Sequence, residues 1–208
     1  MNVRDPGTAY RMSFTIGGLF LNESVAAAVA QERLGDWGLT QQAIESGEAV
    51  GFRKTSSMHR AAREVVTRLR RLTEAELGLL RRGAREEQAA LLWLAVCRTY
   101  RLVGEFAIDE LQERFLSMRP ELEPEAFGRF IEAKAEWNKE LATLRPSTRQ
   151  KLQQVLFRIL REAGLLSREG EIQRMPLSKR LLATLGERNT SELAFFPGAA
   201  PPARRRKA

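Results

Sequence analysis

Few residues of this sequence have side chains suited to catalysis or metal binding. The 208 residues include one histidine, His59, and one cysteine, Cys97. A single histidine rules out a His-based metal cluster, and Cys97 lies in the most apolar run of the chain, where cysteines are usually inert. A Cys97–His59 catalytic pair has no supporting motif, and neither G-x-x-x-x-G-K-[S/T] nor G-x-G-x-x-G occurs. The sequence therefore predicts a protein that is not an enzyme and that holds no cofactor or metal.

Acidic residues are frequent between residues 105 and 140. Paired carboxylates can act as general acid and base or as metal ligands. Here they recur at helical spacing, and such a charge run is normally a solvated face. We interpret them as surface residues, with a two-carboxylate site as the alternative.

Arginines dominate one face of the segment SSMHRAAREVVTRLRRL, residues 56–72. At 100° per residue, the apolar residues fall on the opposite face. Guanidinium groups at this density can bind phosphates or enter a groove of a nucleic acid. The alternative is a solvated face that pairs with acidic residues elsewhere. The predicted binding residues here are Arg60, Arg63, Arg70 and Arg71; the predicted buried residues are Met58, Ala62, Val65, Leu69 and Leu72.

A second basic face lies on the predicted helix STRQKLQQVLFRILREAG, for which we expect a capping box of Ser147 with Gln150 and an end at Gly164. Its polar side combines cations with a hydrogen-bonding amide, which suits a recognition helix in a major groove. The alternative is ordinary surface, because any amphipathic helix has a polar side. The predicted binding residues on this helix are Lys151, Gln154, Arg158 and Arg161.

The segment that follows this helix predicts a small β-hairpin near residues 166–176. Glu169-Gly170 forms a turn signal, and EIQRM alternates in polarity. A helix followed by such a hairpin is typical of the end of a winged helix-turn-helix. Arg168 and Arg174 would then lie on the wing and contact the nucleic-acid backbone.

The charge of the chain is unevenly distributed. The formal net charge is +8, with −3 in residues 1–50, +7 in 51–101, −5 in 102–144 and +9 in 145–208. Two basic blocks flanking an acidic one favour a polyanionic partner. The alternative is that basic and acidic blocks face each other inside one fold. The terminal RRRK would add non-specific affinity or only solubility.

The apolar opening stretch YRMSFTIGGLFLNES, residues 10–24, resembles a signal peptide. Its uninterrupted apolar run has only eight residues, far below the ~20 that span a bilayer. The residues after it predict a helix start, with Asn22 or Ser24 as the cap and an end at Gly35. We therefore expect a buried N-terminal segment, no membrane contact and a cytoplasmic protein.

Helical periodicity dominates the chain, which predicts an all-α, compact multi-helix bundle. The nine consecutive apolar residues from Ala89 to Cys97 predict its central helix, and residues 124–144 predict one acidic helix. We expect an N-terminal helical lobe at residues 1–85 and a C-terminal lobe at 86–188 with a helix-turn-helix-like end. Periodicity is lost near Asn189, so residues 189–208 are expected to form a disordered basic tail.

Four segments, in order along the chain, resemble the small A component (BrxA) of BREX bacteriophage-exclusion systems. They are YRMSFTIGGLFLNES, EEQAALLWLAVCRTYR, AKAEWNKEL and STRQKLQQVLFRILREAGLL, and the resemblance extends from about Tyr10 to Leu185. It implies a small all-helical fold similar to NusB-type antitermination factors, with helix-turn-helix-like parts. It also implies double-stranded DNA binding within a phage-defence system and supplies no catalytic residues.

The expected function is thus a non-enzymatic component of a BREX-type system that binds double-stranded DNA. Its expected partners are DNA and other BREX components. One alternative is a protein–protein adaptor within the defence complex. Another is RNA binding, which the antitermination-like fold would allow, although only 7% of residues are aromatic and available for base stacking.

Overall fold

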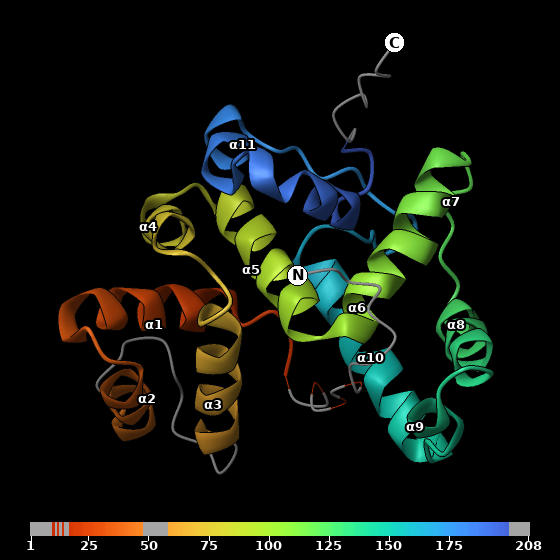
Figure 1. Cartoon of the computed structure of the whole chain (residues 1–208), viewed down its shortest axis with the longest axis horizontal. Helices are drawn as coiled ribbons and strands as arrows, with labels where there is room; N and C mark the ends of the chain where they lie inside the picture. The colour runs from red at the N-terminus through yellow and green to blue at the C-terminus, as the bar shows by residue number, and fades with distance from the viewer. Residues whose placement is uncertain (1–9, 11, 13, 15–16, 48–57, 200–208) are drawn as a thin grey trace.

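The computed structural model describes Tyr10, Met12, Phe14 and residues 17–47 and 58–199. This part of the chain is an all-α bundle with isolated antiparallel bridges and no longer strand, which confirms the predicted fold class (Figure 1). The helices are α1 (Leu21–Leu34), α2 (Trp37–Ser46), α3 (Met58–Leu69), α4 (Glu74–Arg82), α5 (Arg85–Thr99), α6 (Arg101–Phe106), the π-helix η1 (Ala107–Gln112), α7 (Glu113–Leu116), α8 (Glu125–Ala135), α9 (Lys139–Ala142), α10 (Pro146–Glu162), α11 (Lys179–Leu185) and the 3₁₀-helix η2 (Glu187–Phe195).

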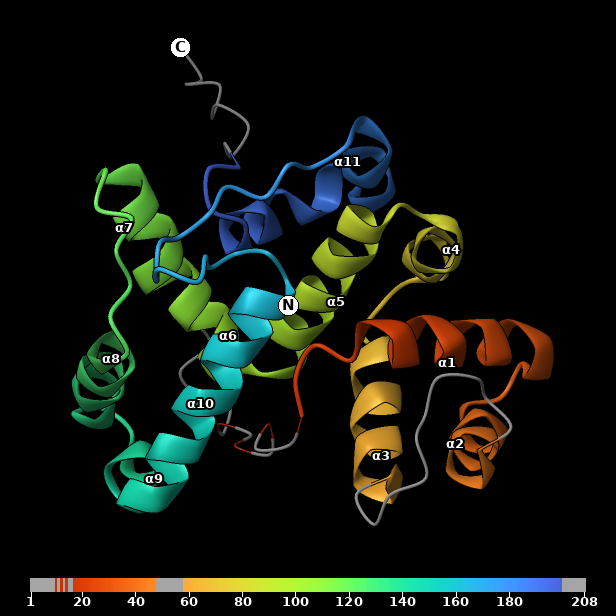
Figure 2. The same ribbon diagram turned by 180° about the vertical axis from the view of Figure 1, so that it is seen from behind.

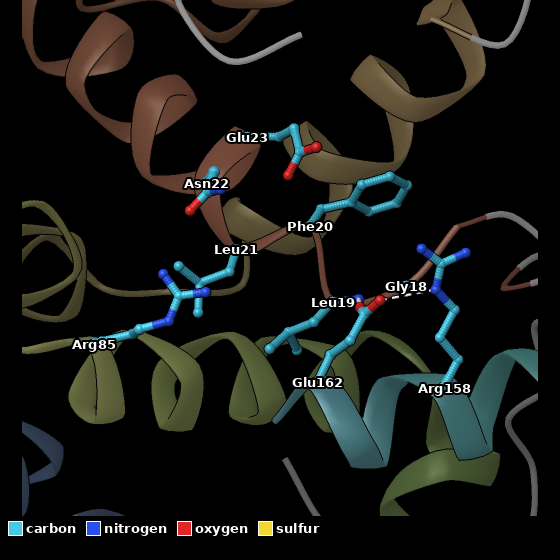
Figure 3. A pocket seen from close by; sticks show the side chains of 9 residues that line it. All are labelled: Gly18, Leu19, Phe20, Leu21, Asn22, Glu23, Arg85, Arg158 and Glu162. Atoms are coloured by element: carbon cyan, nitrogen blue, oxygen red, sulfur yellow. Dashed lines mark hydrogen bonds and ion pairs between the residues drawn. The ribbon is translucent and has the colours of Figure 1, made fainter. Parts of the chain in front are cut away.

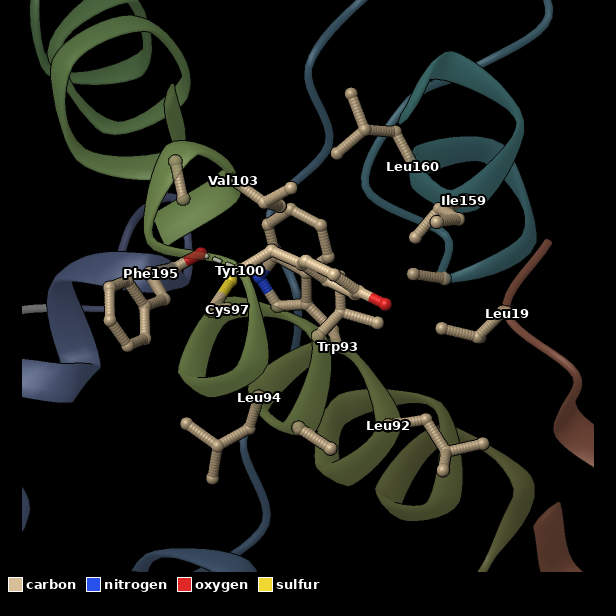
Figure 4. Close-up of a cluster of buried hydrophobic side chains, with 14 of the residues drawn as sticks. Leu19, Leu92, Trp93, Leu94, Cys97, Tyr100, Val103, Ile159, Leu160 and Phe195 are labelled. Atoms are coloured by element: carbon tan, nitrogen blue, oxygen red, sulfur yellow. Dashed lines mark hydrogen bonds between the residues drawn. The ribbon is translucent and has the colours of Figure 1, made fainter. Parts of the chain in front are cut away.

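Helix α5 is the centre of the bundle, as the apolar run predicted. Every residue from Ala89 to Cys97 is buried, and α5 packs against α1, α3, α4, α6 and η2. Figure 4 shows Trp93 and Tyr100 between Phe195 of η2 and the α10 residue Ile159. The core therefore joins elements from both ends of the sequence.

The N-terminal segment is buried, as expected. Phe14 is fully buried and Leu19 is 1% exposed. The predicted cap of α1 is wrong, because the helix begins at Leu21 and its N-cap is Phe20, whose side chain makes no capping bond and whose φ is 58°. Ser24 is instead buried within the helix. None of the described helices combines the length and the apolar character that a membrane span needs.

A buried carboxylate fastens Tyr10 to the bundle. The Tyr10 hydroxyl donates to Glu105 over 2.8 Å, while Lys134 Nζ and Arg101 Nε lie 3.0 and 2.7 Å from the same carboxylate. Burial alone would raise the pKa of Glu105, but hydrogen bonds from Lys134, Tyr10 and Arg101 lower it overall. Burial and the bond to Glu105 raise the pKa of Tyr10 to about 12.

The expected acidic helix at residues 124–144 is divided into α8 and α9. The break falls at Trp137, and the side chain of Asn138 caps α9 by accepting from Leu141 N. Helix α10 then begins at Pro146, with no side-chain cap. The predicted Ser147 capping box is therefore wrong, because proline at the first helical position starts the helix one residue earlier. Gly164, at φ 74°, follows the end of α10 as predicted.

The segment after α10 folds back on itself. Leu166 and Ile172 form an antiparallel bridge, and Ser167 N donates to the carbonyl oxygen of Glu171 over 2.9 Å. A second bridge joins Glu171 to Glu121, before α8. The hairpin geometry is thus present at bridge level, and its role as a DNA-contacting wing stays a prediction.

The packed part of the chain extends at least to Ala199, beyond the expected start of the disordered tail at residue 189. Trp93 Nε1 donates to the carbonyl oxygen of Phe195 over 2.8 Å, and Phe195 and Phe196 are buried. A 3₁₀-helix has a different period from an α-helix, so the α-helical pattern gave no sign of η2. The basic RRRK lies outside the described residues. The proposed division into two lobes stays a prediction.

We predict that Glu105→Gln destabilises the protein at neutral pH and flattens its acid unfolding. Because the folded pKa of Glu105 is below the unfolded value of 4.5, its stabilisation is present above that value and is lost as pH falls through the folded pKa. The free energies of unfolding of wild type and variant should therefore converge below about pH 4.5. Urea titrations between pH 7 and pH 3 measure this. The exposed Glu86→Gln is the control, and a constant gap between wild type and Glu105→Gln would contradict the prediction.

Candidate nucleic-acid interface

The arginine face of α3 is exposed. Arg60, Arg63, Arg70 and Arg71 all lie at the surface, and none forms an ion pair with another residue in the part of the chain that the structure describes. The opposite face is buried as predicted and packs against α1 and α5; its residues are Met58, Ala62, Val65, Leu69 and Leu72. The helix therefore presents four guanidinium groups to solvent without a salt bridge to any described residue, although Arg63 also interacts electrostatically with Glu45 of α2.

One arginine of α3 has a structural position that the sequence reading missed. Arg68 is 2% exposed; its Nε lies 2.6 Å from Glu64 Oε1, and its Nη1 donates to the carbonyl oxygen of Gly18 over 2.7 Å. Its guanidinium also lies 5.5 Å from the Phe20 ring centre and 6.0 Å from that of Tyr100. The available signal was the i,i+4 spacing of Glu64 and Arg68 at the edge of the apolar face.

The outer face of α10 is also exposed. Lys151, Gln154, Arg158 and Arg161 all lie at the surface. Arg158 Nε lies 2.7 Å from Glu162 Oε1, one turn along the same helix, and 64% of the Arg158 side chain remains exposed. The guanidinium of Arg161 lies 6.0 Å from the ring centre of Phe157, which is itself buried.

The two predicted wing arginines are exposed as well. Arg168 lies in the turn that follows Ser167, and Arg174 follows the bridge at Ile172. Both follow α10 in the chain and lie in the segment that folds back on itself. Whether either contacts DNA stays a prediction.

The N-terminal segment lies between α3 and α10 and contacts both (Figure 2). Arg68 of α3 donates to Gly18, and Leu19 N donates to Glu162 of α10 over 2.5 Å. A side chain at Gly18 would displace the Glu162 carboxylate from its present position, so glycine is compatible with this close approach. The segment thereby sets the positions of the two basic helices on either side of it.

A cavity of about 330 Å³ opens beside this contact. It is bounded by the start of α1, the start of α5 and the end of α10 (Figure 3). Its lining residues are Gly18, Leu19, Phe20, Leu21, Asn22, Glu23, Arg85, Arg158 and Glu162. The cavity therefore reaches the exposed face of α10 through the Arg158–Glu162 pair.

The carboxylates of the middle segment pair with other cations rather than with the predicted binding residues. Lys134 lies 2.8 Å from Asp109, and Arg149 lies 2.9 Å from Glu132. The candidate arginines of α3 and α10 are not neutralised by this acidic block in the described structure. The alternative in which basic and acidic blocks face each other therefore holds for some of the described residues, such as Arg149 with Glu132 and Arg101 with Glu105, but for none of the predicted arginines.

Comparison with known proteins identifies the family. The BrxA family model matches residues 8–189. The chain belongs to the BrxA family. Membership indicates a component of a BREX phage-defence system, as the sequence resemblance implied. No curated protein sequence matches the chain.

A solved structure shares the fold of this BrxA-family protein. It is the crystal structure of an uncharacterized protein from Magnetospirillum magneticum, with a TM-score of 0.77 at 20% sequence identity. The match covers 91% of this chain and 98% of the other. At this identity the likeness concerns the fold alone.

The environments of Cys97 and His59 do not favour catalysis. Burial raises the pKa of the Cys97 thiol well above its ordinary value, which keeps it protonated and weakly nucleophilic. His59 is exposed at the start of α3, where Nδ1 lies 3.0 Å from Glu45. Among the described residues, no group of three or more His, Cys, Asp or Glu side chains is arranged to hold a metal ion.

We predict that Arg68 stabilises the fold whereas its neighbour Arg70 does not. Arg68→Ala leaves the Glu64 carboxylate buried without its cation and should lower the free energy of unfolding by about 3–5 kcal/mol. Arg70→Ala, at an exposed site on the same helix, should change it by less than about 0.5 kcal/mol. Urea unfolding measures both. A loss below about 1 kcal/mol for Arg68→Ala would show that the buried pair is not needed.

Proposed function

We propose that this BrxA-family protein is a non-enzymatic, cytoplasmic component of a BREX system that binds double-stranded DNA. The supporting observation is the solvent exposure of all ten predicted binding residues. Of these, only Arg158 is paired with an acid in the described part of the chain. Unpaired surface guanidinium and ammonium groups can release counterions from DNA phosphates, which is the main source of non-specific affinity. The ten residues are Arg60, Arg63, Arg70, Arg71, Lys151, Gln154, Arg158, Arg161, Arg168 and Arg174.

In this proposal α10 is the recognition helix. Its 17 residues extend about 25 Å, and a major groove about 12 Å wide admits one α-helix. Helix α8 and the short α9 precede it, and the hairpin with the Leu166–Ile172 bridge follows it. The bridge from Glu121 to Glu171 adds a third segment beside the hairpin. This order of elements supports a winged helix-turn-helix in which Gln154 faces bases and Arg168 faces the backbone.

Helix α3 supplies the second basic surface. It lies on the other side of Gly18 and Leu19 from α10, so its arginines would extend the phosphate-binding surface beyond the recognition helix. Phosphate contacts fix the register of a protein on the duplex but carry no sequence information. We therefore propose that α3 contributes affinity through phosphate contacts and that α10 contributes specificity through contacts with bases.

We predict that neutralising two arginines of α3 weakens duplex binding and its salt dependence. Each lost phosphate contact reduces the slope of log K against log [salt] by about 0.9, so Arg63→Gln with Arg70→Gln should reduce it by about 1.8. Retention of a labelled duplex between 50 and 200 mM salt measures this. Lys179→Gln is the matched control, because it removes one charge from α11, at the opposite end of the molecule from α3 (Figure 1).

Two outcomes would overturn the DNA proposal. The first is the absence of duplex retention by the wild-type protein at low salt. The second is preferential displacement of the duplex by single-stranded RNA, which would favour RNA binding instead. A third outcome concerns the arginine face alone. If each charge removed from α3 lowers duplex affinity by as much as Lys179→Gln does, the arginine face has no special role.

Exposed apolar side chains favour a second candidate function, that of a protein–protein adaptor. Trp137 is 89% exposed at the end of α8, and Met118 is 86% exposed after α7. If these residues dock another BREX component, Trp137→Ala with Met118→Ala should abolish its co-purification. The Arg63→Gln, Arg70→Gln variant should retain it. The reverse pattern would mean that the partner binds the arginine face.

A further inference from the structure

We propose that Glu162 competes with DNA phosphates for the guanidinium of Arg158 and so limits the affinity of α10 for the nucleic-acid backbone. This inference rests on the proposed DNA-binding function and assigns a residue that limits affinity within it. Its basis is the position of one carboxylate beside an otherwise solvent-accessible arginine of the candidate recognition helix.

The Glu162 carboxylate is held in place from two sides. Oε1 accepts from Arg158 Nε over 2.7 Å, and Oε2 accepts from Leu19 N over 2.5 Å. The backbone at Gly18 lies directly against it. A surface carboxylate normally exchanges among rotamers, but these contacts fix this one at the end of α10 (Figure 3).

The carboxylate already provides Arg158 with the kind of acceptor that a phosphate would offer. Carboxylate and phosphate oxygens both accept charge-assisted hydrogen bonds from guanidinium groups. Arg158 remains 64% exposed, and the 330 Å³ cavity beside it leaves space for an approaching anion. A phosphate that binds Arg158 must therefore displace Glu162 or share the guanidinium with it, against the repulsion between the two anions.

This competition acts on the backbone and not on the bases. Every duplex carries the same phosphates, so Glu162 weakens all binding by α10, whatever the sequence. A protein whose backbone affinity is reduced depends more on base contacts, such as those proposed for Gln154. Because the loss is the same for every sequence, the ratio of specific to non-specific affinity is unchanged, and Glu162 limits the strength of binding and its salt dependence.

The test is Glu162→Gln in the full-length chain, measured by retention of a labelled duplex between 50 and 200 mM salt. Glutamine keeps an oxygen that can accept from Leu19 N but removes the charge. We expect about fivefold tighter binding at the lowest salt and a log–log salt slope steeper by about 0.9. In an Arg158→Gln background the same substitution should have almost no effect, because the guanidinium for which Glu162 competes is gone.

The matched control is Glu110→Gln. It removes the acid of another i,i+4 pair, in which Arg114 Nε lies 2.9 Å from Glu110. This pair lies in η1 and α7, well before α10 in the sequence. Its effect on duplex retention should be below about twofold. Thermal unfolding of each variant checks that the Leu19 contact and the fold are retained.

Different results separate the two levels of the proposal. If the wild-type chain binds duplex DNA but Glu162→Gln binds no tighter, or gains equally in the Arg158→Gln background, the competition is wrong and DNA binding stands. If the wild-type chain retains no duplex at 50 mM salt, the proposed function fails and this inference fails with it.

Discussion

The buried guanidinium of Arg68 is the interaction on which the arrangement of this surface depends. A buried arginine is costly unless its charge is paired; here Nε and Nη1 of Arg68 have acceptors, whereas Nη2 has none among the described residues. Glu64 provides the charge, and the carbonyl oxygen of Gly18 provides an acceptor 50 residues earlier in the chain. This requirement brings the N-terminal segment against α3. Because Leu19 also donates to Glu162, the same few residues hold α10 on their other side.

The backbone of this segment adopts an unfavourable conformation in order to make these contacts. Phe20 has a φ of 58°, a region that costs a non-glycine residue about 1 kcal/mol, and α1 begins there without a side-chain cap. In return, the Phe20 ring packs over the Arg68 guanidinium, and Leu19 enters the core. The interactions on both sides over-determine the local backbone, which is how such strain persists in a folded protein.

Periodicity in the sequence was sufficient for most of the fold and for the exposed faces. The core helix from Ala89 to Cys97 and the buried stripe of α3 followed from apolar spacing alone. What local patterns could not show were features decided by partners distant in the sequence. Arg68 is buried because it pairs with Glu64 and donates to the carbonyl oxygen of Gly18. Phe195 is buried because it packs against α5, where Trp93 donates to its carbonyl oxygen. Neither a hydrophilic residue type nor a loss of α-helical period predicts exposure at positions where tertiary contacts determine burial.

The same distinction explains why net charge is an incomplete guide to function. The sequence total of +8 already cancels Arg68 against Glu64 and Arg149 against Glu132, but it does not show which cations, such as Arg63, are left without a salt bridge in the described structure. Such pairs add nothing to the field that a polyanion meets at close range. In the proposed function, the charge that meets nucleic acid is the subset that folding leaves without salt bridges on the described parts of α3 and α10. Folding also positions one acid, Glu162, within that subset, so the strength of the surface is set by how cations are paired as much as by their number.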